Sequence, residues 1–321
     1  MSFNIYRYGT LALGSQLAFP ELSLAPELTP SVVFKIRRAP RRVATASEPL
    51  HEWRSPEGAL YASFRRNGDR YLIHFKRRAL FEVSGALSTV HCTPICDASP
   101  LTLRHLFLDQ VMPLILAMTG RHVLHASAVE CQGDAVAFVG KSGMGKSTIA
   151  AAIGRGRGRI LADDCLLLDE HGGQFLAASP YSSLRLWTDS VSALELTGAS
   201  RAHRTWKRQF LMDSGLSFQS SPSPLRAVFF LTRPRRGRSE VVTAMSPAEA
   251  VVALVGSAFK LDIRDRSYLQ AEFRLFSRLV TAVPCYRLVV RKSLAGLPRV
   301  MEAVVRALDV TAVSTPDVLT A

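Results

Sequence analysis

The stretch Ala135-Val-Ala-Phe-Val139, followed by Gly140-Lys-Ser-Gly-Met-Gly-Lys-Ser-Thr148, decides how the rest of the chain is read. Its first five residues form a short apolar run, which predicts a buried strand. The next nine match the pattern G-x-x-x-x-G-K-[ST], known as Walker A. The Ala/Ile-rich segment Ile149–Ile153 then predicts a helix. A strand, a glycine-rich loop and a helix start are the context that this pattern requires.

The glycines, lysine and serine of this loop are the residue types that bind a phosphate group and its metal ion. Gly140, Gly143 and Gly145 let the backbone turn its N–H groups inward, and the positive end of the helix dipole adds to the attraction. Lys146 can reach terminal phosphates, and the Ser147 hydroxyl can hold Mg²⁺. We therefore predict a nucleotide-binding loop rather than an ordinary glycine-rich turn. The predicted binding residues are Gly140, Lys141, Ser142, Gly143, Met144, Gly145, Lys146, Ser147 and Thr148.

Two adjacent carboxylates follow the loop helix. Ile160-Leu-Ala162 predicts a short buried strand that leads into Asp163-Asp164. Carboxylates at a strand end, close to a phosphate-binding loop, are suited to hold Mg²⁺ and to accept a proton. The alternative is that one of the two only caps a turn. We favour the functional interpretation.

The strand before the loop predicts a mixed sheet. His122–Val129 is also strand-like, and only the turn Gln132-Gly-Asp134 separates it from Ala135–Val139. Strands joined by so tight a turn are antiparallel neighbours, whereas doubly wound nucleotide domains join parallel neighbours through helices. His125 is then expected beside the loop as a candidate catalytic residue. The alternative is an ordinary core histidine.

The composition indicates a soluble globular chain with a basic surface. Of 321 residues, 48% are hydrophobic and 21% charged, yet the net charge is +14, and only seven of the 40 basic residues are lysine. Such a surface favours acidic partners, although an arginine-rich composition throughout would look the same. No aromatic-interleaved nucleic-acid motif accompanies the arginine clusters, so nucleic acid is not the expected partner.

The remaining compositional features point to the cytoplasm. The five cysteines suit a reducing compartment, and the N-terminus lacks the pattern of a secretory signal. The apolar stretch Leu106–Met118 is too short to span a bilayer and contains Asp109, so no membrane insertion is expected.

We predict four parts along the chain. Residues 1–98 read as a β-rich module, a candidate for substrate docking, residues 99–121 as a linking helix, residues 122–310 as the P-loop kinase domain, and residues 311–321 as a tail. The module's strand candidates are Ser31–Ile36, Ala59–Phe64, Tyr71–Phe75 and Leu80–Val83, with a hairpin turn at Arg66–Asp69. The linking helix is 101–119, with Pro113 as a kink or break.

The second half of the chain supplies the remaining elements. We expect a polar, partly mobile loop over 198–224, in which Lys207 and Arg208 are candidate anion contacts, and Arg185 is a further candidate for phosphate or substrate. The other expected elements are a hairpin over 166–178, a helix start at Thr188-Asp189, a strand at 225–231, helices at 247–259 and 267–281, a strand at 286–290 and a helix at 297–308.

Three stretches together resemble a known family, the C-terminal catalytic domain of HPr serine kinase/phosphorylase. They are Leu124–Val129, Val139–Thr148 and Ile160–Cys165, in the family's order and spacing. The resemblance covers about residues 120–190. It implies a P-loop nucleotide-binding domain of the HPr kinase/phosphoenolpyruvate carboxykinase type, an α/β fold with a mixed sheet. The N-terminal module looks more like HPr-kinase-related proteins of peptide biosynthesis clusters, including kinases of lasso-peptide precursors.

The resemblance implies roles for individual residues. Lys146 would stabilise the transferred phosphoryl group, and Ser147 and Asp163 would ligate Mg²⁺. Asp164 would accept the proton of a substrate hydroxyl, with His125 near the reacting phosphate. The family's glutamate metal ligand has no counterpart in Ser179–Trp187, which speaks against the reverse phosphorolysis and against HPr as the substrate.

The sequence therefore predicts an ATP- and Mg²⁺-dependent kinase that acts on a serine or threonine of a peptide or small protein, such as a ribosomal-peptide precursor. A small-molecule kinase of the same fold and a non-catalytic ATP-binding switch or assembly protein are the alternatives. Family members are often oligomers, so the resemblance leaves a homo-oligomer open.

Overall fold

The computed structural model describes residues 3–37, 47–54, 58–156, 158–197, 201–202, 207–211, 216–234, 241–291 and 293–313. The chain divides into two compact units. The first comprises residues 1–121 together with 259–270, and the second comprises residues 122–258 together with 271–321. The chain therefore leaves the second unit after Ala258 and returns to it at Ala271.

The first unit is built on an eight-stranded mixed sheet with the order β1-β2-β3-β8-β7-β6-β5-β4. The four strand candidates and the turn between β5 and β6 are confirmed. Four further strands were not predicted. The strands are β1 (Asn4–Tyr8), β2 (Leu11–Ser15), β3 (Val32–Ile36), β4 (Glu48–Arg54), β5 (Leu60–Asn67), β6 (Arg70–Phe75), β7 (Ala79–Val83) and β8 (Thr89–Pro94).

A long helical segment packs on this sheet. It consists of α1 (Pro100–Leu106), the π-helical turn η1 (Phe107–Val111) and α2 (Met112–Met118). The helix does not break at Pro113: it continues to Met118 and widens to a π-helical turn just before Pro113, where the N–H of Met112 donates to Phe107 O. The Phe107 ring is fully buried and lies 4.3 Å from that of Phe34, measured between centroids.

The same segment is longer than the apolar stretch read from the sequence. Residues Pro100–Met118 form 19 helical residues with a mean hydropathy of 1.3, which is enough by length and composition to cross a membrane. However, 67% of the most apolar window is buried inside the protein. A helix buried to this extent is typical of a protein core, so its length and composition are only weak support for a membrane span.

The second unit contains a nine-stranded mixed sheet, in which β10 and β11 form the predicted antiparallel hairpin. On its other side β11 pairs in parallel with β18, and β18 pairs in parallel with β20. The predicted mixed α/β sheet is thus confirmed. The strands are β9 (His122–Leu124), β10 (Ala126–Cys131), β11 (Asp134–Val139), β12 (Arg159–Ala162), β13 (Leu166–His171), β14 (Gln174–Ala178), β18 (Ser223–Thr232), β19 (Val242–Ala244) and β20 (Cys285–Val289).

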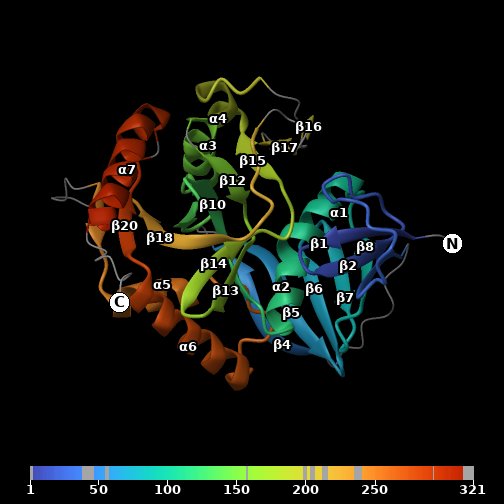
Figure 1. Cartoon of the computed structure of the whole chain (residues 1–321). Coiled ribbons are helices and arrows are strands. Elements are labelled where there is room, and N and C mark those ends of the chain that lie inside the picture. The colour runs from blue at the N-terminus through green and yellow to red at the C-terminus, as the bar shows by residue number, and fades with distance from the viewer. Residues whose placement is uncertain are drawn as a thin grey trace. The chain divides into compact units, whose positions relative to one another are not determined.

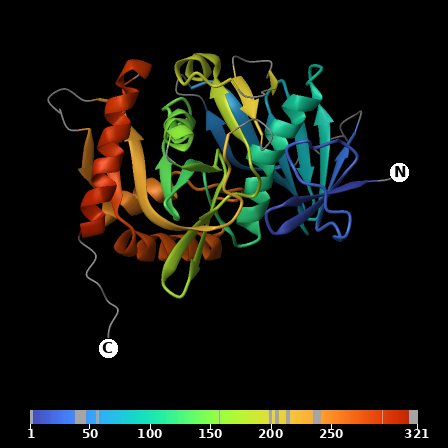
Figure 2. The same ribbon diagram turned by 45° about the horizontal axis from the view of Figure 1, so that its top comes forward.

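Helices cover both faces of this sheet, as the ribbon shows (Figures 1 and 2). Val136 and Phe138 of β11 pack in the core that also holds Val300 and Val304 of α7. The alternate residues Ala137 and Val139 pack in a second core with α5 and α6. This burial on both faces explains the continuous apolar run of β11. The helices are α3 (Lys146–Gly156), α5 (Pro247–Val255), α6 (Arg266–Ala282), the 3₁₀ turn η2 (Leu294–Gly296) and α7 (Leu297–Val313).

A separate three-stranded sheet lies beside α3. It comprises β15 (Leu184–Trp187), β17 (Lys207–Phe210) and β16 (Arg201–Ala202), and α4 (Thr188–Ala193) follows β15. The expectation of a loop over 198–224 is therefore wrong for Lys207–Phe210, which pairs with β15, and for the start of β18. Tertiary pairing decides here, because Phe210 enters the small core beside α3. Residues 198–200, 203–206 and 212–215 lie outside the described part.

Candidate active site

The loop between β11 and α3 has the backbone that its glycines were expected to permit. Gly145 has a φ of 101°, in a region that side-chain-bearing residues rarely enter. At Gly140 a Cβ atom would lie 3.1 Å from the Cβ of Leu231, so a side chain there would require β18 to shift slightly. The helix α3 then begins at Lys146. The loop therefore ends at a helix N-terminus, whose free N–H groups and dipole attract anions.

The Lys146 side chain is almost fully buried in this loop. Its ammonium group donates a hydrogen bond to Gly140 O at 2.9 Å, so it curls back over the loop that it follows. Burial lowers the pKa of Lys146, and the carboxylates of Asp164 and Asp163 counteract that shift. A buried ammonium beside a ring of N–H groups can pair with a phosphate at little further desolvation cost.

Asp163 is held by three donors. The hydroxyls of Ser147 and Ser127 each donate to its Oδ1 at 2.7 Å, and the Arg185 backbone N–H donates to its Oδ2 at 2.9 Å. Burial raises the pKa of Asp163 to about 7, and the charge of neighbouring Asp164 adds to the rise, against the hydrogen bonds. A buried carboxylate with this pKa is half protonated near neutral pH unless a cation joins it.

Asp164 has a different environment from its neighbour. Its φ is 62°, a left-handed value that a non-glycine residue keeps only where its surroundings hold it. The Arg185 guanidinium makes a short ion pair with Oδ2, and His125 Nε2 lies 3.8 Å from Oδ1. Burial would raise the pKa of Asp164, but the charges of His125, Lys207 and Lys146 outweigh it and lower the pKa.

His125 contributes little of that charge at neutral pH. Burial, with the positive charge of Lys146 adding to it, lowers the pKa of His125 to about 4. His125 is therefore neutral at pH 7. Lys207, Lys146 and the Arg185 ion pair keep Asp164 ionised. The backbone break at His125, between β9 and β10, turns the side chain toward this group.

The small sheet supplies the cationic side of the site. Trp187 of β15 and Lys207 of β17 are direct cross-strand partners, and the Lys207 ammonium lies 5.3 Å from the Trp187 ring centroid. Both side chains line the same cavity. Arg208 is the next residue along β17 and is exposed outside that cavity, since side chains alternate along a strand.

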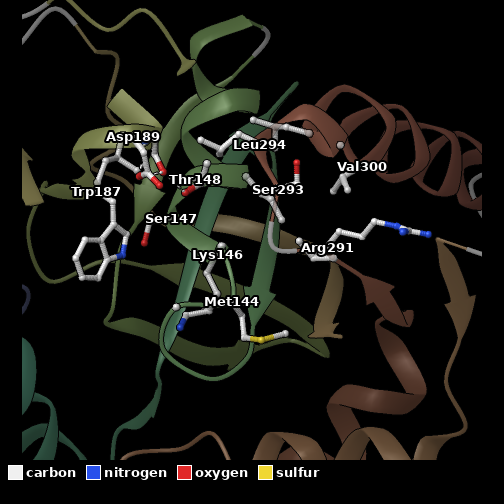
Figure 3. Close-up of a pocket in the computed structure, with 18 of the residues that line it drawn as sticks. Met144, Lys146, Ser147, Thr148, Trp187, Asp189, Arg291, Ser293, Leu294 and Val300 are labelled. Carbon is white, nitrogen blue, oxygen red and sulfur yellow. Dashed lines mark hydrogen bonds between the residues drawn. The ribbon is translucent and has the colours of Figure 1, made fainter. Parts of the chain in front are cut away.

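A cavity of about 600 Å³ runs over the loop and the start of α3. Figure 3 shows Trp187 and Asp189 on one side of the α3 N-terminus, and Ser293, Leu294 and Val300 on the other. Asp164 lines the first side, whereas Asp163 lies beneath the surface and is not part of the wall. A molecule in the cavity can therefore touch the loop and Asp164 together.

The structure thus brings most of the predicted site residues together. Asp163, Asp164, His125 and Arg185 form one cluster with Ser147, and Lys146 and Lys207 lie close enough to act on it electrostatically. Arg208 does not line the cavity. Of the loop, residues 142–148 line the cavity, and Gly140 and Lys141 do not.

Several residues that line or support the site were not predicted, and three of them contact the loop, Asp163 or Lys207 directly. Ser127 was not singled out, although it lies two residues beyond His125 on the strand next to the loop. Arg233 donates to Gly143 O at 3.1 Å and to Val290 O at 3.3 Å, which ties the loop to the end of β20. The sequence feature that could have marked Arg233 is its position directly after a buried strand. Trp187 is exposed by 44%, and only its pairing with Lys207 places it at the cavity.

The donors fit a magnesium ion. Ser147 and Asp163 offer one hydroxyl and one carboxylate, both hard oxygen ligands, at the helix N-terminus where phosphates would bind. The raised pKa of Asp163 also indicates a carboxylate that a cation would stabilise. No group of three or more His, Cys, Asp or Glu side chains suited to a metal occurs in the described residues. A ligand set completed by substrate phosphates is what Mg²⁺ commonly uses.

Comparisons with known proteins identify no family for this chain. No protein-family model matches the chain, and no curated protein matches it. Among solved structures, an HPr(Ser) kinase/phosphatase from Coxiella burnetii matches with a TM-score of 0.32 and 13% sequence identity, over 59% of this chain and 97% of that one. A similarity this distant carries no functional argument, so the site itself must carry it.

Proposed function

We propose that this protein is an ATP- and Mg²⁺-dependent kinase. It transfers the γ-phosphoryl group to a serine or threonine hydroxyl of a peptide or small protein, with a ribosomal-peptide precursor as one candidate acceptor. One observation carries the proposal: the hydroxyl of Ser147, at the α3 N-terminus, is hydrogen-bonded to Asp163, while adjacent Asp164 lines the cavity above the loop. This arrangement unites the two needs of phosphoryl transfer, charge neutralisation and an oriented nucleophile.

The loop side of the site would bind and neutralise the phosphates. Residues 142–148, Lys146 among them, line the cavity over the start of α3, where the terminal phosphates would lie. Lys146 would exchange its hydrogen bond with Gly140 O for one with a phosphate oxygen. Removing one such contact commonly costs about 10²–10³ in rate, because the charge that develops in the transition state then lacks a partner.

Ser147 and Asp163 would hold Mg²⁺, which would neutralise negative charge on the bound phosphates. Ser127 donates to the same carboxylate oxygen and fixes its orientation.

Asp164 is the proposed base. The acceptor hydroxyl oxygen forms a bond to the γ-phosphorus, the bond to the bridging oxygen of ADP breaks, and the hydroxyl proton passes to Asp164. The exposure of Asp164 to the cavity favours this assignment over Asp163, which lies beneath. The lowered pKa of Asp164 makes it a weak base that is ionised before the transfer, so it orients the hydroxyl and takes the proton only as the bond to phosphorus forms.

A transfer assay tests the proposal. Purified protein is incubated with Mg²⁺, γ-labelled ATP and short serine-containing peptides, and the peptides are examined by mass spectrometry. The proposal expects one phosphate on serine and none when EDTA replaces Mg²⁺. ATP bound without transfer to any peptide, but with transfer to small hydroxyl compounds, would contradict the peptide acceptor. ATP bound without any transfer would indicate a switch.

A further inference from the structure

The cavity continues past the loop to an end that the proposed chemistry does not use. The order of the strands in the sheet places the two ends of the cavity on opposite sides of the loop. β12, which leads into the acid pair, lies on the β10 side of β11, whereas β20 lies on the β18 side. The cavity-lining residues at the end of β20 and beyond it, among them Val290, Leu294 and Val300, therefore stand across the loop from Asp164. Figure 3 shows this opposition, with Trp187 on one side and Leu294 and Val300 on the other.

This far end is apolar. Its wall is formed by Val289 and Val290 of the β20 terminus, Leu294 of η2, and Leu297 and Val300 of α7, with Met144 of the loop. Leu294 and Leu297 are only half-buried, so their side chains present apolar surface to the cavity. Among the described residues that line this end, none is an acid or a carboxamide. The polar side chains there are Ser293 and the arginines at 233, 291 and 299.

We propose that this apolar end receives the base and sugar of the nucleotide, and that it accepts adenine and guanine nucleotides with similar affinity. The proposal rests on the proposed function. A nucleoside triphosphate is elongated. If its terminal phosphate lies at Asp164 and its phosphate chain crosses the loop, its base must lie at the end away from the acid pair. The half-buried faces of Leu294 and Leu297 give a flat ring apolar surface to pack on.

The weak selectivity follows from the wall's chemistry. A site that hydrogen-bonds a substrate group rejects analogues lacking it by about 10⁴–10⁵, whereas an apolar pocket discriminates by only about 10–200-fold. Adenine and guanine differ in their exocyclic groups and in a ring N–H. Acidic, amide and backbone groups distinguish these features best by hydrogen bonding. A single hydrogen bond from an arginine or serine side chain to N7, which adenine and guanine both carry, adds affinity with little discrimination.

Gly296 offers a way to block this end. It lines the cavity, and a Cβ atom added to it would meet nothing within 4 Å. Gly296→Trp should therefore fill the apolar end without displacing the backbone. Gly156 is a matched control. It is exposed at the far end of α3, it does not line the cavity, and a Cβ atom there also meets nothing within 4 Å.

Calorimetry on the full chain, with Mg²⁺ and either ATP, GTP or inorganic tripolyphosphate, tests the proposal. We expect ATP and GTP to bind within about tenfold of each other, and both at least about tenfold more tightly than tripolyphosphate. Gly296→Trp should reduce ATP and GTP affinity to the level of tripolyphosphate, and Leu294→Ala should weaken ATP and GTP binding by a similar factor. Gly156→Trp should retain wild-type affinities.

Four results would overturn the proposal. ATP binding unaffected by Gly296→Trp but lost in Trp187→Ala would place the base at the acid side instead, and the proposed kinase function would stand. A difference between the ATP and GTP affinities of more than about 200-fold, in either direction, would refute the weak selectivity alone. Equal affinity for ATP and tripolyphosphate would show that the base makes no contact. Binding of none of the three would overturn this inference together with the proposed function.

Discussion

Asp163 and Asp164 are adjacent in sequence, yet their surroundings separate their roles. Asp163 accepts hydrogen bonds from two serine hydroxyls and a backbone N–H beneath the cavity, and burial raises its pKa to about 7. Asp164 faces the cavity, pairs with Arg185 and has a lowered pKa. One carboxylate is thus suited to a cation and the other to a hydroxyl, a division that separate substitutions can test.

The raised pKa of Asp163 predicts how Mg²⁺ affects stability. The folded protein binds a proton at Asp163 between the pKa of the unfolded carboxyl, about 3.9, and about 7. Since the folded state then binds more protons than the unfolded state, this group's contribution to the free energy of unfolding falls as pH rises through that window. We expect Mg²⁺ to raise the melting temperature more at pH 8 than at pH 5, measured by thermal melts at matched ionic strength.

The control for that measurement is Asp163→Asn, which cannot titrate. The Mg²⁺ effect should then be small at both pH values. An equal Mg²⁺ effect at pH 5 and pH 8 in the wild-type protein would mean that Asp163 is not its ligand.

Lys146 should matter for transfer and little for folding. Its ammonium has one described hydrogen bond, to Gly140 O, and its burial already lowers its pKa. We expect Lys146→Ala to reduce single-turnover transfer by about 10²–10³. The melting temperature should change little or rise, because a buried charge is removed. Transfer within threefold of wild type would exclude Lys146 from the phosphate site.

At the scale of elements, the end of β18 holds the loop. Arg233 bridges Gly143 O and Val290 O, so it ties the loop to the end of β20. We expect Arg233→Ala to raise the KM for ATP by about tenfold through loss of loop order, with a smaller effect on kcat. The measurement is steady-state kinetics with ATP as the varied substrate.

Arg226 is the matched control for Arg233. It lies near the start of the same strand and bonds Asp134 Oδ2 and Leu308 O, away from the cavity. Arg226→Ala should leave the KM for ATP unchanged. Equal KM effects in the two variants would mean that the strand's general stability, not the loop contact, is responsible.

Local pattern predicted those elements that local chemistry decides. The capping box of Ser246 and Glu249 fixes the start of α5 at Pro247, where the predicted helix begins, and the Gln132-Gly133 turn fixes the β10–β11 hairpin. By contrast, β17 is polar in sequence and becomes a strand only because β15 pairs with it. β4 begins with a charged residue and Pro49 and is held by β5. Such strands depend on partners distant in sequence, which periodicity cannot reveal.

The site residues also fall into those that local pattern predicts and those that strand pairing places. The loop, the acid pair and His125 were predictable, because motif, strand end and hairpin place them by local rules. Ser127, Trp187 and Arg233 were not, since each joins the site through strand register: β10 beside β11, β15 beside β17, and β18 beside β20. The pKa difference between Asp163 and Asp164 also needs the three-dimensional contacts.

At the scale of the whole molecule, the chain cannot be divided by one cut. Residues 259–270 belong to the first unit although residues on both sides of them belong to the second. His51 Nε2 bonds the carbonyls of Lys260 at 3.1 Å and Leu261 at 3.2 Å, and Phe259 and Leu261 are buried. A polypeptide of residues 122–321 alone would leave these two apolar side chains without their partners.

We therefore expect the 122–321 polypeptide to aggregate, or to bind a hydrophobic dye, far more than the full chain does. Replacing both Phe259 and Leu261 by serine in that polypeptide should restore solubility, since exposed apolar surface is the cause. Size-exclusion chromatography with dye fluorescence measures both. A monodisperse 122–321 polypeptide with low dye binding would show that the segment does not depend on the first unit.

The central claim is the division of labour between the two aspartates, and one paired measurement tests it most directly. Mg²⁺-ATP affinity and single-turnover transfer to a serine peptide are compared for wild type, Asp163→Asn and Asp164→Asn. We predict that Asp164→Asn keeps Mg²⁺-ATP affinity within about threefold and loses at least about 10² in transfer rate. Asp163→Asn should lose the Mg²⁺-dependent part of ATP binding. Near-wild-type transfer by Asp164→Asn, or unchanged Mg²⁺ dependence in Asp163→Asn, would contradict the account.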